Sequence, residues 1–339
     1  MQISLQRAKV LIARFRRQKI LVAGDLMLDR YIYGTAQRLS PEAPVPIVRV
    51  REEKNMPGGA ANVARNVKAL GGGAAMFGAI GADQAGRELL NVMHKDEIET
   101  GHVTRLRQIK TTVKMRIIAE RQQVVRVDWD STLRLDNPLF ELLCRKAAAA
   151  AARASGIILA DYAKGIICQR IVDVILGAAK KHNVPVALDP KENRNLLLDG
   201  ISVITPNHKE AFALAGMTEA EPAQNPIKDR ALLRVSDILL EKWHPNLLIV
   251  TLGARGMLVA PKGRAPFHVA TAAREVFDVS GAGDTTIATM LLALTADADY
   301  CEAAELANCA AGVVVGKIGT AVCSSRELLE FMSDLRRCR

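Results

Sequence analysis

Short apolar runs that alternate with longer amphipathic stretches constrain the fold of this 339-residue chain more than any other feature. The apolar runs lie at 19–24, 74–80, 156–160, 184–188, 203–204 and 247–251. Stretches with helical periodicity separate many of them, notably at 60–70, 86–93, 137–154, 169–182 and 284–294. This order of elements predicts an α/β fold with a central, mostly parallel sheet that carries helices on both faces.

Two segments interrupt the alternation. Residues 30–53 are rich in β-branched residues and proline, and residues 110–130 alternate apolar with polar side chains. A period of two predicts strands with one exposed face, and a turn at 121–122 would make a hairpin of the second segment. We expect both segments to lie outside the main sheet, where they would cover a ligand or pair with another subunit.

Composition limits the classes of function. The chain is 49% hydrophobic and 24% charged, which is typical of a globular enzyme. Its net charge of +10 suits an anionic ligand, but the basic residues are scattered, so we expect no nucleic-acid partner. Six cysteines without metal-binding spacing favour a cytoplasmic protein. We expect no signal peptide and no membrane span, because the apolar runs are too short.

The N-terminal segment 4–17 places apolar side chains at helical spacing among several arginines. This pattern predicts an amphipathic helix, which would either pack on its own domain or lie on a membrane surface. Because packing on the domain is much the commoner arrangement for such a helix, we expect it here.

The segment 281–284, with the sequence Gly-Ala-Gly-Asp, carries the strongest chemical signal because it leads directly into an apolar helix. The backbone N–H groups of Gly281, Ala282 and Gly283 would form an anion hole at the helix N-terminus, where they and the helix dipole can hold a phosphoryl group. Asp284 is placed to accept a proton from an attacking hydroxyl. The alternative is an aspartate that only caps a glycine turn.

A second glycine-rich segment also precedes a predicted helix. Gly58 and Gly59 would let the backbone approach a ligand closely, and Asn62 could then hydrogen-bond the hydroxyls of a sugar. An ordinary turn before a helix explains the two glycines equally simply.

Two polar motifs follow predicted strands. Thr251, Gly253 and Gly256 suit the phosphate or ribose of a nucleotide that lies over the carboxyl end of a strand. Asn207 and Glu210 are one helical turn apart and could hold the hydration shell of Mg²⁺. A capping box at the start of a helix is an equally good explanation of that pair.

Several other functional motifs are missing. The segment 312–318 resembles a phosphate-binding P-loop but is one residue short and lacks Ser or Thr after its lysine. The sequence contains no His-Glu-x-x-His, Gly-x-Ser-x-Gly or Gly-x-Gly-x-x-Gly motif. Walker-type NTPases, zinc hydrolases, esterases and dehydrogenases are therefore disfavoured.

In order and spacing, the glycine-rich and polar motifs together resemble the ribokinase (PfkB) family of carbohydrate kinases, from residue 20 to about residue 329. The resemblance implies one ATP- and Mg²⁺-dependent kinase domain over residues 1–339, with lid segments at about 30–53 and 110–130 that would join two subunits as a homodimer. It makes Asp284 the base, with the anion hole formed by Gly281, Ala282 and Gly283. It assigns the binding of ATP to Thr251, Gly253, Gly256 and Asn308. Asn207 and Glu210 would contact phosphate and hold magnesium through water, and the sugar would be bound by Asp29, Gly58, Gly59 and Asn62.

Within that family, the stretches 24–31, 38–46, 161–165, 189–191 and 312–320 resemble the bacterial heptose 7-phosphate kinases. The resemblance implies phosphorylation of D-glycero-β-D-manno-heptose 7-phosphate at O1, which gives the 1,7-bisphosphate used for ADP-heptose and the lipopolysaccharide inner core. Some relatives fuse a nucleotidyltransferase domain to the kinase, and we expect none here. The alternatives are a kinase for another sugar or a nucleoside, and a sugar-phosphate sensor without catalytic activity.

A sugar that already carries a phosphate needs cationic partners at its far end. The stretches that resemble the heptose kinases supply these candidates, together with one neighbouring acid: Arg38, Arg116, Lys164 and Lys191, with Asp189. We expect the four cations to gather around that phosphate.

Overall fold

The computed structural model describes residues 3–120, 122–132, 137–192, 195–273, 275–317 and 319–337. Its main sheet has nine strands in the order β13-β12-β11-β10-β9-β8-β1-β4-β5. In chain order these are β1 (Lys19–Gly24), β4 (Gly73–Gly81), β5 (Glu99–Leu106), β8 (Gly156–Ala160), β9 (Val186–Asp189), β10 (Val203–Ile204), β11 (Leu247–Thr251), β12 (Met257–Pro261) and β13 (Phe267–Val269).

The pairing of these strands confirms the predicted fold class. Neighbouring strands from β5 to β11 run parallel, and only β12 and β13 run antiparallel to their neighbours. The central strands are buried along nearly their whole length, as expected for a sheet that is covered on both sides.

Helices form a layer on each face of this sheet, and side chains of alternate strand residues pack against one layer or the other. Ile20 and Val22 of β1 face a core shared with α1 (Leu5–Phe15), α2 (Ala60–Ala69), α3 (Gln84–Lys95), α8 (Ala282–Thr295), α9 (Tyr300–Val315) and α10 (Ser325–Arg337). Leu21 and Ala23 face the opposite core, shared with α4 (Asn137–Ala151), α5 (Gln169–His182), α6 (His208–Leu214) and α7 (Arg230–Trp243).

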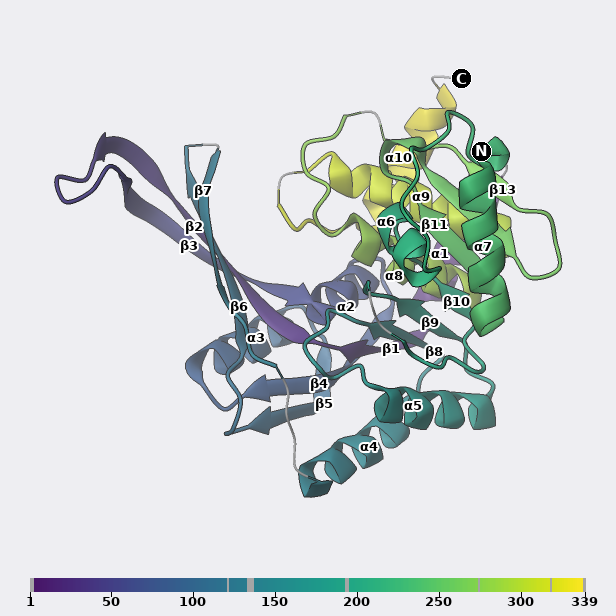
Figure 1. Cartoon of the computed structure of the whole chain (residues 1–339), viewed down its shortest axis with the longest axis horizontal. Helices are drawn as coiled ribbons and strands as arrows, with labels where there is room; N and C mark the ends of the chain where they lie inside the picture. Colours follow the sequence, from purple (N-terminus) through teal and green to yellow (C-terminus); the bar gives the residue numbers. More distant parts are fainter. Residues whose placement is uncertain are drawn as a thin grey trace.

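A second sheet, which we call the small sheet, reaches away from the body of the molecule (Figure 1). It contains β2 (Leu26–Leu39), β3 (Pro46–Gly59), β6 (Thr112–Ala119) and β7 (Gln122–Trp129), in the order β3-β2-β6-β7. The predicted hairpin is confirmed as the antiparallel pair β6 and β7, although Arg121 in its turn lies outside the described residues. Because β2 follows β1 almost directly and β3 leads into α2, the small sheet is joined firmly to the body.

The N-terminal helix α1 packs on the body, as expected. Leu11 and Phe15 are fully buried, and Arg7 forms an ion pair of 2.8 Å with Glu302 of α9. Among the described residues, no helix is both long and apolar enough to cross a membrane. Cys144, Cys168 and Cys323 are free thiols, and Cys338 lies outside the described residues.

Candidate active site

The glycine-rich turn at the start of α8 is built to receive an anion. Gly281 precedes the helix with φ of +80°, a left-handed conformation that favours glycine. The N–H of Ala282 is already used, since it donates to the carbonyl of Val279 at 3.2 Å. The next N–H groups of the first turn, on Gly283 and Asp284, have no acceptor within a helix and lie at the positive end of its dipole. A Cβ atom at Gly283 would meet no other atom within 4 Å, so the approach to this turn is open.

Asp284 stands in that first turn with both carboxylate oxygens held. Its Oδ1 accepts a hydrogen bond from the hydroxyl of Tyr162 at 2.6 Å, and its Oδ2 accepts one from Nδ2 of Asn62 at 2.6 Å. Desolvation by the surrounding protein raises the pKa of Asp284 to about 6, and the two hydrogen bonds oppose that rise. The side chain is therefore mostly ionised at neutral pH, with a basicity suited to accepting a proton.

The segment before α2 brings Asn62 and the sugar candidates to the same place. A Cβ atom at Gly58 would lie 2.8 Å from the carboxyl carbon of Asp29, so only glycine lets these strands approach so closely. Gly59 has φ of +56° and immediately precedes α2. Asn62 is 1% exposed, and its Oδ1 has no hydrogen-bond partner among the described residues. An acceptor of this kind beside Asp284 can take a hydroxyl group from a ligand.

The small sheet adds charged side chains to this region. Arg116 on β6 donates to Oδ1 of Asp29 on β2 at 2.8 Å, and its guanidinium lies 5.2 Å from the centre of the Tyr31 ring. Lys114, two residues earlier on β6 and opposite Asp29, lies near enough to oppose the rise in the pKa of Asp284 that burial causes. Lys114 was not predicted as a site residue, although its spacing from Arg116 places both side chains on one face of the strand.

The four predicted cations do not gather in one place. Lys164 forms an ion pair of 2.7 Å with Asp130, and Lys191 forms one of 3.1 Å with Glu210. Arg38 is exposed near the far end of β2, in the part of the small sheet that reaches away from the body (Figure 1). Of the four cations, only Arg116 contacts a predicted sugar residue, Asp29, in the part of the chain that the structure describes. The predicted grouping differs from the structure because long basic side chains form ion pairs with nearby carboxylates. Such pairs cannot be predicted from the spacing of residues in the sequence.

Asp189 ends β9 close to the base and to Glu210. Desolvation raises its pKa well above the usual range, and the charges of Asp284 and Glu210 add to this effect. The shift has the direction expected of a carboxyl group that is desolvated close to two other acids.

A cavity of about 240 Å³ adjoins the turn at the start of α8. The four residues assigned to ATP from the sequence all line it, together with two residues of the turn: Thr251, Gly253, Gly256 and Asn308, with Ala282 and Gly283. Valine side chains supply much of the remaining wall, so the cavity combines an apolar surface with a few polar groups, as ligand sites usually do. Gly256 has φ of +83°, and a Cβ atom there would lie 2.0 Å from the carbonyl oxygen of Val269.

Asn207 and Glu210 form the capping box at the start of α6 that the sequence left as one alternative. Oδ1 of Asn207 accepts from the N–H of Glu210 at 2.9 Å, and Oε2 of Glu210 accepts from the N–H of Asn207 at 3.0 Å. No cluster of three or more metal-binding side chains is found within the described ranges. The side-chain oxygens of this pair can accept hydrogen bonds from the water molecules of a hydrated Mg²⁺. Among the described residues they do not form the larger cluster of ligands that would coordinate the ion directly.

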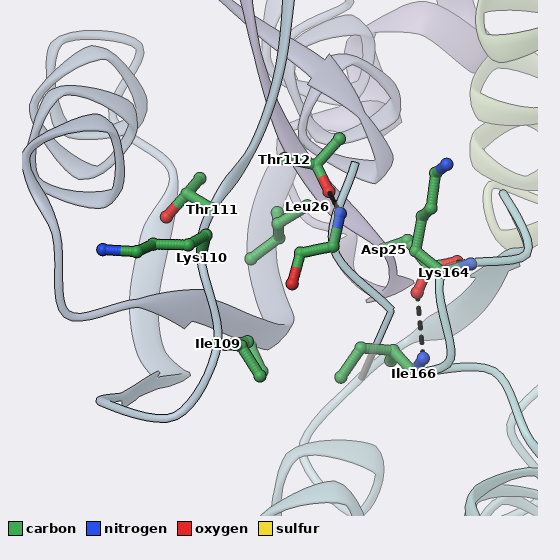
Figure 2. A pocket seen from close by; sticks show the side chains of 10 residues that line it. Asp25, Leu26, Ile109, Lys110, Thr111, Thr112, Lys164 and Ile166 are labelled. Carbon is green, nitrogen blue, oxygen red and sulfur yellow. Dashed lines mark hydrogen bonds between the residues drawn. The ribbon is translucent and has the colours of Figure 1, made fainter. Parts of the chain in front are cut away.

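A much smaller pocket, of about 20 Å³, lies beside Asp25 at the base of the small sheet. Figure 2 shows Thr112 and Leu26 above it and Lys164 and Ile166 beside Asp25. This volume holds about one water molecule and cannot hold a sugar. Its wall contains Asp25 together with Lys164 and Ile166, two residues of the loop after β8 whose backbone N–H groups bond to Asp25.

Comparison with known proteins agrees with this geometry. The pattern of the pfkB family carbohydrate kinases matches residues 17–327. The chain belongs to this family. It is therefore an ATP-dependent sugar kinase, as the sequence predicted.

Two relatives illustrate the similarity within the family. The bifunctional protein HldE of Pseudomonas aeruginosa PAO1 is 40% identical over 320 residues, which cover 94% of this chain and 65% of that protein. HldE of Coxiella burnetii (strain Dugway 5J108-111) is 38% identical over 327 residues, which cover 96% of this chain and 66% of the relative. The chain thus spans slightly less than two thirds of the length of these relatives.

Solved structures of other kinases share the fold. Arabidopsis thaliana ribokinase complexed with ribose and ATP superposes with a TM-score of 0.70 at 20% identity, over 93% of this chain and 98% of that chain. Escherichia coli phosphofructokinase-2 in complex with potassium gives a TM-score of 0.73 at 19% identity, over 94% and 99%. These similarities establish a ribokinase-like fold.

Proposed function

We propose that this kinase transfers the γ-phosphoryl group of ATP to O1 of D-glycero-β-D-manno-heptose 7-phosphate. The product would be the 1,7-bisphosphate, a precursor of ADP-heptose for the lipopolysaccharide inner core. The observation that carries the proposal is that Asp284, a side chain suited to act as a base, lies beside a small sheet that presents Lys114 and Arg116. Phosphorylation of a sugar phosphate needs a base for the acceptor hydroxyl and cations for the phosphate that the sugar already carries. Similarity to the HldE proteins and to the heptose kinase motifs supports it.

In this proposal Asp284 takes the proton of the O1 hydroxyl as O1 attacks the γ-phosphorus atom and the bond to ADP breaks. The N–H groups of Gly283 and Asp284 stabilise the charge on the transferred group. Thr251, Gly253, Gly256 and Asn308 hold the nucleotide in the adjoining cavity. Asn207 and Glu210 would hold Mg²⁺ through water, and the metal would offset the negative charge of the phosphates.

The sugar would lie between the base and the small sheet. The buried Oδ1 of Asn62, which has no protein partner among the described residues, accepts a sugar hydroxyl. Asp29 accepts another beside Gly58 and Gly59, where the absence of side chains leaves room for the ring. Asp189, at the end of β9, would contact a further hydroxyl of the sugar.

Arg116 and Lys114 would bind the 7-phosphate, with Lys164 at the edge of this site. Arg38 and Lys191 lie outside this group, since Lys191 is paired with Glu210 and Arg38 lies far out on β2. The small sheet would act as the lid and exclude water from the phosphoryl group.

The same sheet would join two subunits, because β7 is exposed along its whole length and carries exposed apolar residues, among them Val125 and Trp129. Arg38 would then contact the second subunit. Sedimentation at several protein concentrations tests this: a mass that stays near that of one chain contradicts the homodimer.

We propose a cytoplasmic location, and fractionation of cells that express the protein tests it.

The release of ADP from ATP and Mg²⁺ tests the reaction. We compare heptose 7-phosphate with unphosphorylated heptose, fructose 6-phosphate, ribose and adenosine. Selective turnover of heptose 7-phosphate supports the proposal. Preference for another acceptor would refute the substrate but leave the role of Asp284 intact, and a lack of turnover with every acceptor would point to a sugar-phosphate sensor.

A further inference from the structure

Tyr162 was not among the predicted site residues, yet its hydroxyl contacts the proposed base. It lies in the loop that connects β8 to α5, and its ring packs against the core on the side of α8. The hydroxyl donates to Oδ1 of Asp284 at 2.6 Å, a short distance for such a bond and typical of a charged acceptor. Tyr162 therefore reaches Asp284 from a loop that lies outside the motif 281–284.

The loop that carries Tyr162 is fixed by one buried carboxylate. Asp25 is 2% exposed and follows β1, which pairs with β8 in parallel. Its Oδ2 accepts from the N–H groups of Tyr162 at 3.1 Å and Lys164 at 2.9 Å. Its Oδ1 accepts from the N–H of Ile166 at 2.9 Å, the bond drawn in Figure 2. Three bonds to one charged group hold successive parts of the loop in place.

The backbone of the same loop adopts a conformation that needs such support. Ala163 has φ of +58° and Gly165 has φ of +113°, and the N–H of Ala163 donates to Oδ1 of Asp161 at 2.8 Å. A positive φ at a non-glycine residue is unfavourable unless surrounding contacts stabilise it. The anchored loop thus fixes the direction in which the Tyr162 side chain leaves the backbone.

Charged groups from several elements surround Asp284, and they act in opposite directions. Asp29 from β2 disfavours its ionised form, whereas Lys114 from β6 favours it, and the charge of Asp284 in turn raises the pKa of Asp189 from β9. Asn62 and Tyr162 donate hydrogen bonds to the ionised form and so also favour it. Between them, the two donors occupy one site on each carboxylate oxygen and fix the plane of the carboxylate.

We propose that Tyr162 is a positioning residue of the phosphoryl transfer: its hydroxyl, placed by the loop that Asp25 anchors, holds the carboxylate of Asp284 ionised and oriented toward the acceptor hydroxyl. The inference rests on the proposed role of Asp284 as the base. It does not depend on which sugar is the acceptor.

A direct titration of Asp284 tests the inference without any substrate. The protein is labelled with ¹³C at aspartate side-chain carboxyl groups, and the Asp284→Asn variant identifies the signal by its loss. We compare the wild type with Tyr162→Phe and with Tyr31→Phe as the matched control. Tyr31 also lies near the site and its hydroxyl makes one bond of 2.6 Å, but to Thr320 rather than to Asp284.

We expect the midpoint of the Asp284 titration to rise by about one pH unit in Tyr162→Phe and to stay in place in Tyr31→Phe, because only the first variant removes a donor from the carboxylate. An unchanged midpoint in Tyr162→Phe, in a variant whose thermal unfolding matches that of the wild type, would overturn the inference. The same rise in both variants would also overturn it, because the effect would then be a general one.

Kinetics supply a second readout. With any acceptor that the wild type phosphorylates, the acid limb of kcat/KM should move to higher pH in Tyr162→Phe by the same amount as the titration midpoint. A lower rate with an unmoved acid limb would indicate a purely structural role and refute the inference. If no acceptor is phosphorylated, the proposed function fails, but the titration still decides whether Tyr162 controls Asp284.

Discussion

Asn62 and Asp284 meet at 2.6 Å although 222 residues separate them in the sequence. Each lies in the first turn of a helix, α2 or α8, and the two helices pack together on the same face of the main sheet. Asn66 strengthens this contact, since its side chain accepts a hydrogen bond from the hydroxyl of Thr285 at 2.7 Å and donates to the carbonyl of Asn62 at 2.9 Å. The base is therefore oriented by the packing of two helices rather than by its own loop alone.

Replacement of Asp284 by Asn should nearly abolish turnover. The amide keeps the shape of the side chain but cannot accept the proton of the acceptor hydroxyl, so we expect kcat to fall by roughly 100- to 10,000-fold. The affinity for ATP should change little, because the adjoining cavity is lined at this helix by Ala282, Gly283 and Thr286 rather than by Asp284. ADP release and equilibrium binding of ATP measure the two effects, and near-normal turnover would refute the assignment of the base.

The pH dependence of the wild type should reflect the pKa of Asp284, which burial raises to about 6. The reaction needs the ionised form, so kcat/KM should be constant well above pH 6 and fall about tenfold for each pH unit well below it. Initial rates measured from about pH 3.5 to pH 9 at saturating Mg²⁺ and ATP test this. An acid limb near pH 4, the value of an ordinary aspartate, would contradict the environment described for Asp284.

Replacement of Arg116 by Met should weaken the binding of a phosphorylated sugar in particular. Loss of a charged contact to the phosphate should raise KM for the sugar phosphate by about 10- to 100-fold, with little change in KM for ATP. Steady-state kinetics with phosphorylated and unphosphorylated acceptors measure this selectivity. The control is Arg145→Met. Arg145 is an exposed residue of α4, which packs on the face of the main sheet opposite to α8. If KM rises equally for the phosphorylated and the unphosphorylated acceptor, Arg116 does not bind the phosphate.

Much of this fold was predictable because its central strands and longest helices carry simple patterns. The bounds of β8 and α5 agree with the predicted ranges, since one is a continuous apolar run and the other has a regular apolar face. The edge strand β5 was missed because it alternates exposed and half-buried residues without an apolar run. The strand β12 was missed although Met257–Pro261 is a buried apolar run, because it follows β11 closely and no α-helix separates the two. The strand β13 was missed because it is only three residues long and half-buried.

The candidate site was predictable only where local sequence determines geometry. The turn before Asp284 and the glycines beside Asp29 produce their shapes within a few residues. The part played by Tyr162 could not be read from its neighbours, because its hydroxyl meets a partner 122 residues away. The grouping of cations failed for the same reason, since Lys164 is paired with Asp130, which follows β7.

Replacement of Gly283 by Ala should lower activity without harming the fold. A Cβ atom there meets no other atom within 4 Å, so Gly283→Ala should fold normally and gain up to about 1 kcal/mol from the helix preference of alanine. The added methyl group would nevertheless occupy the approach to the N–H groups of the turn, and we expect kcat/KM for ATP to fall at least tenfold. Gly177→Ala is the matched control, because this glycine of α5 also has open space around it but lies outside the site. Thermal unfolding and ADP release measure both variants. If Gly283→Ala is as active as Gly177→Ala, the turn does not hold the transferred phosphoryl group.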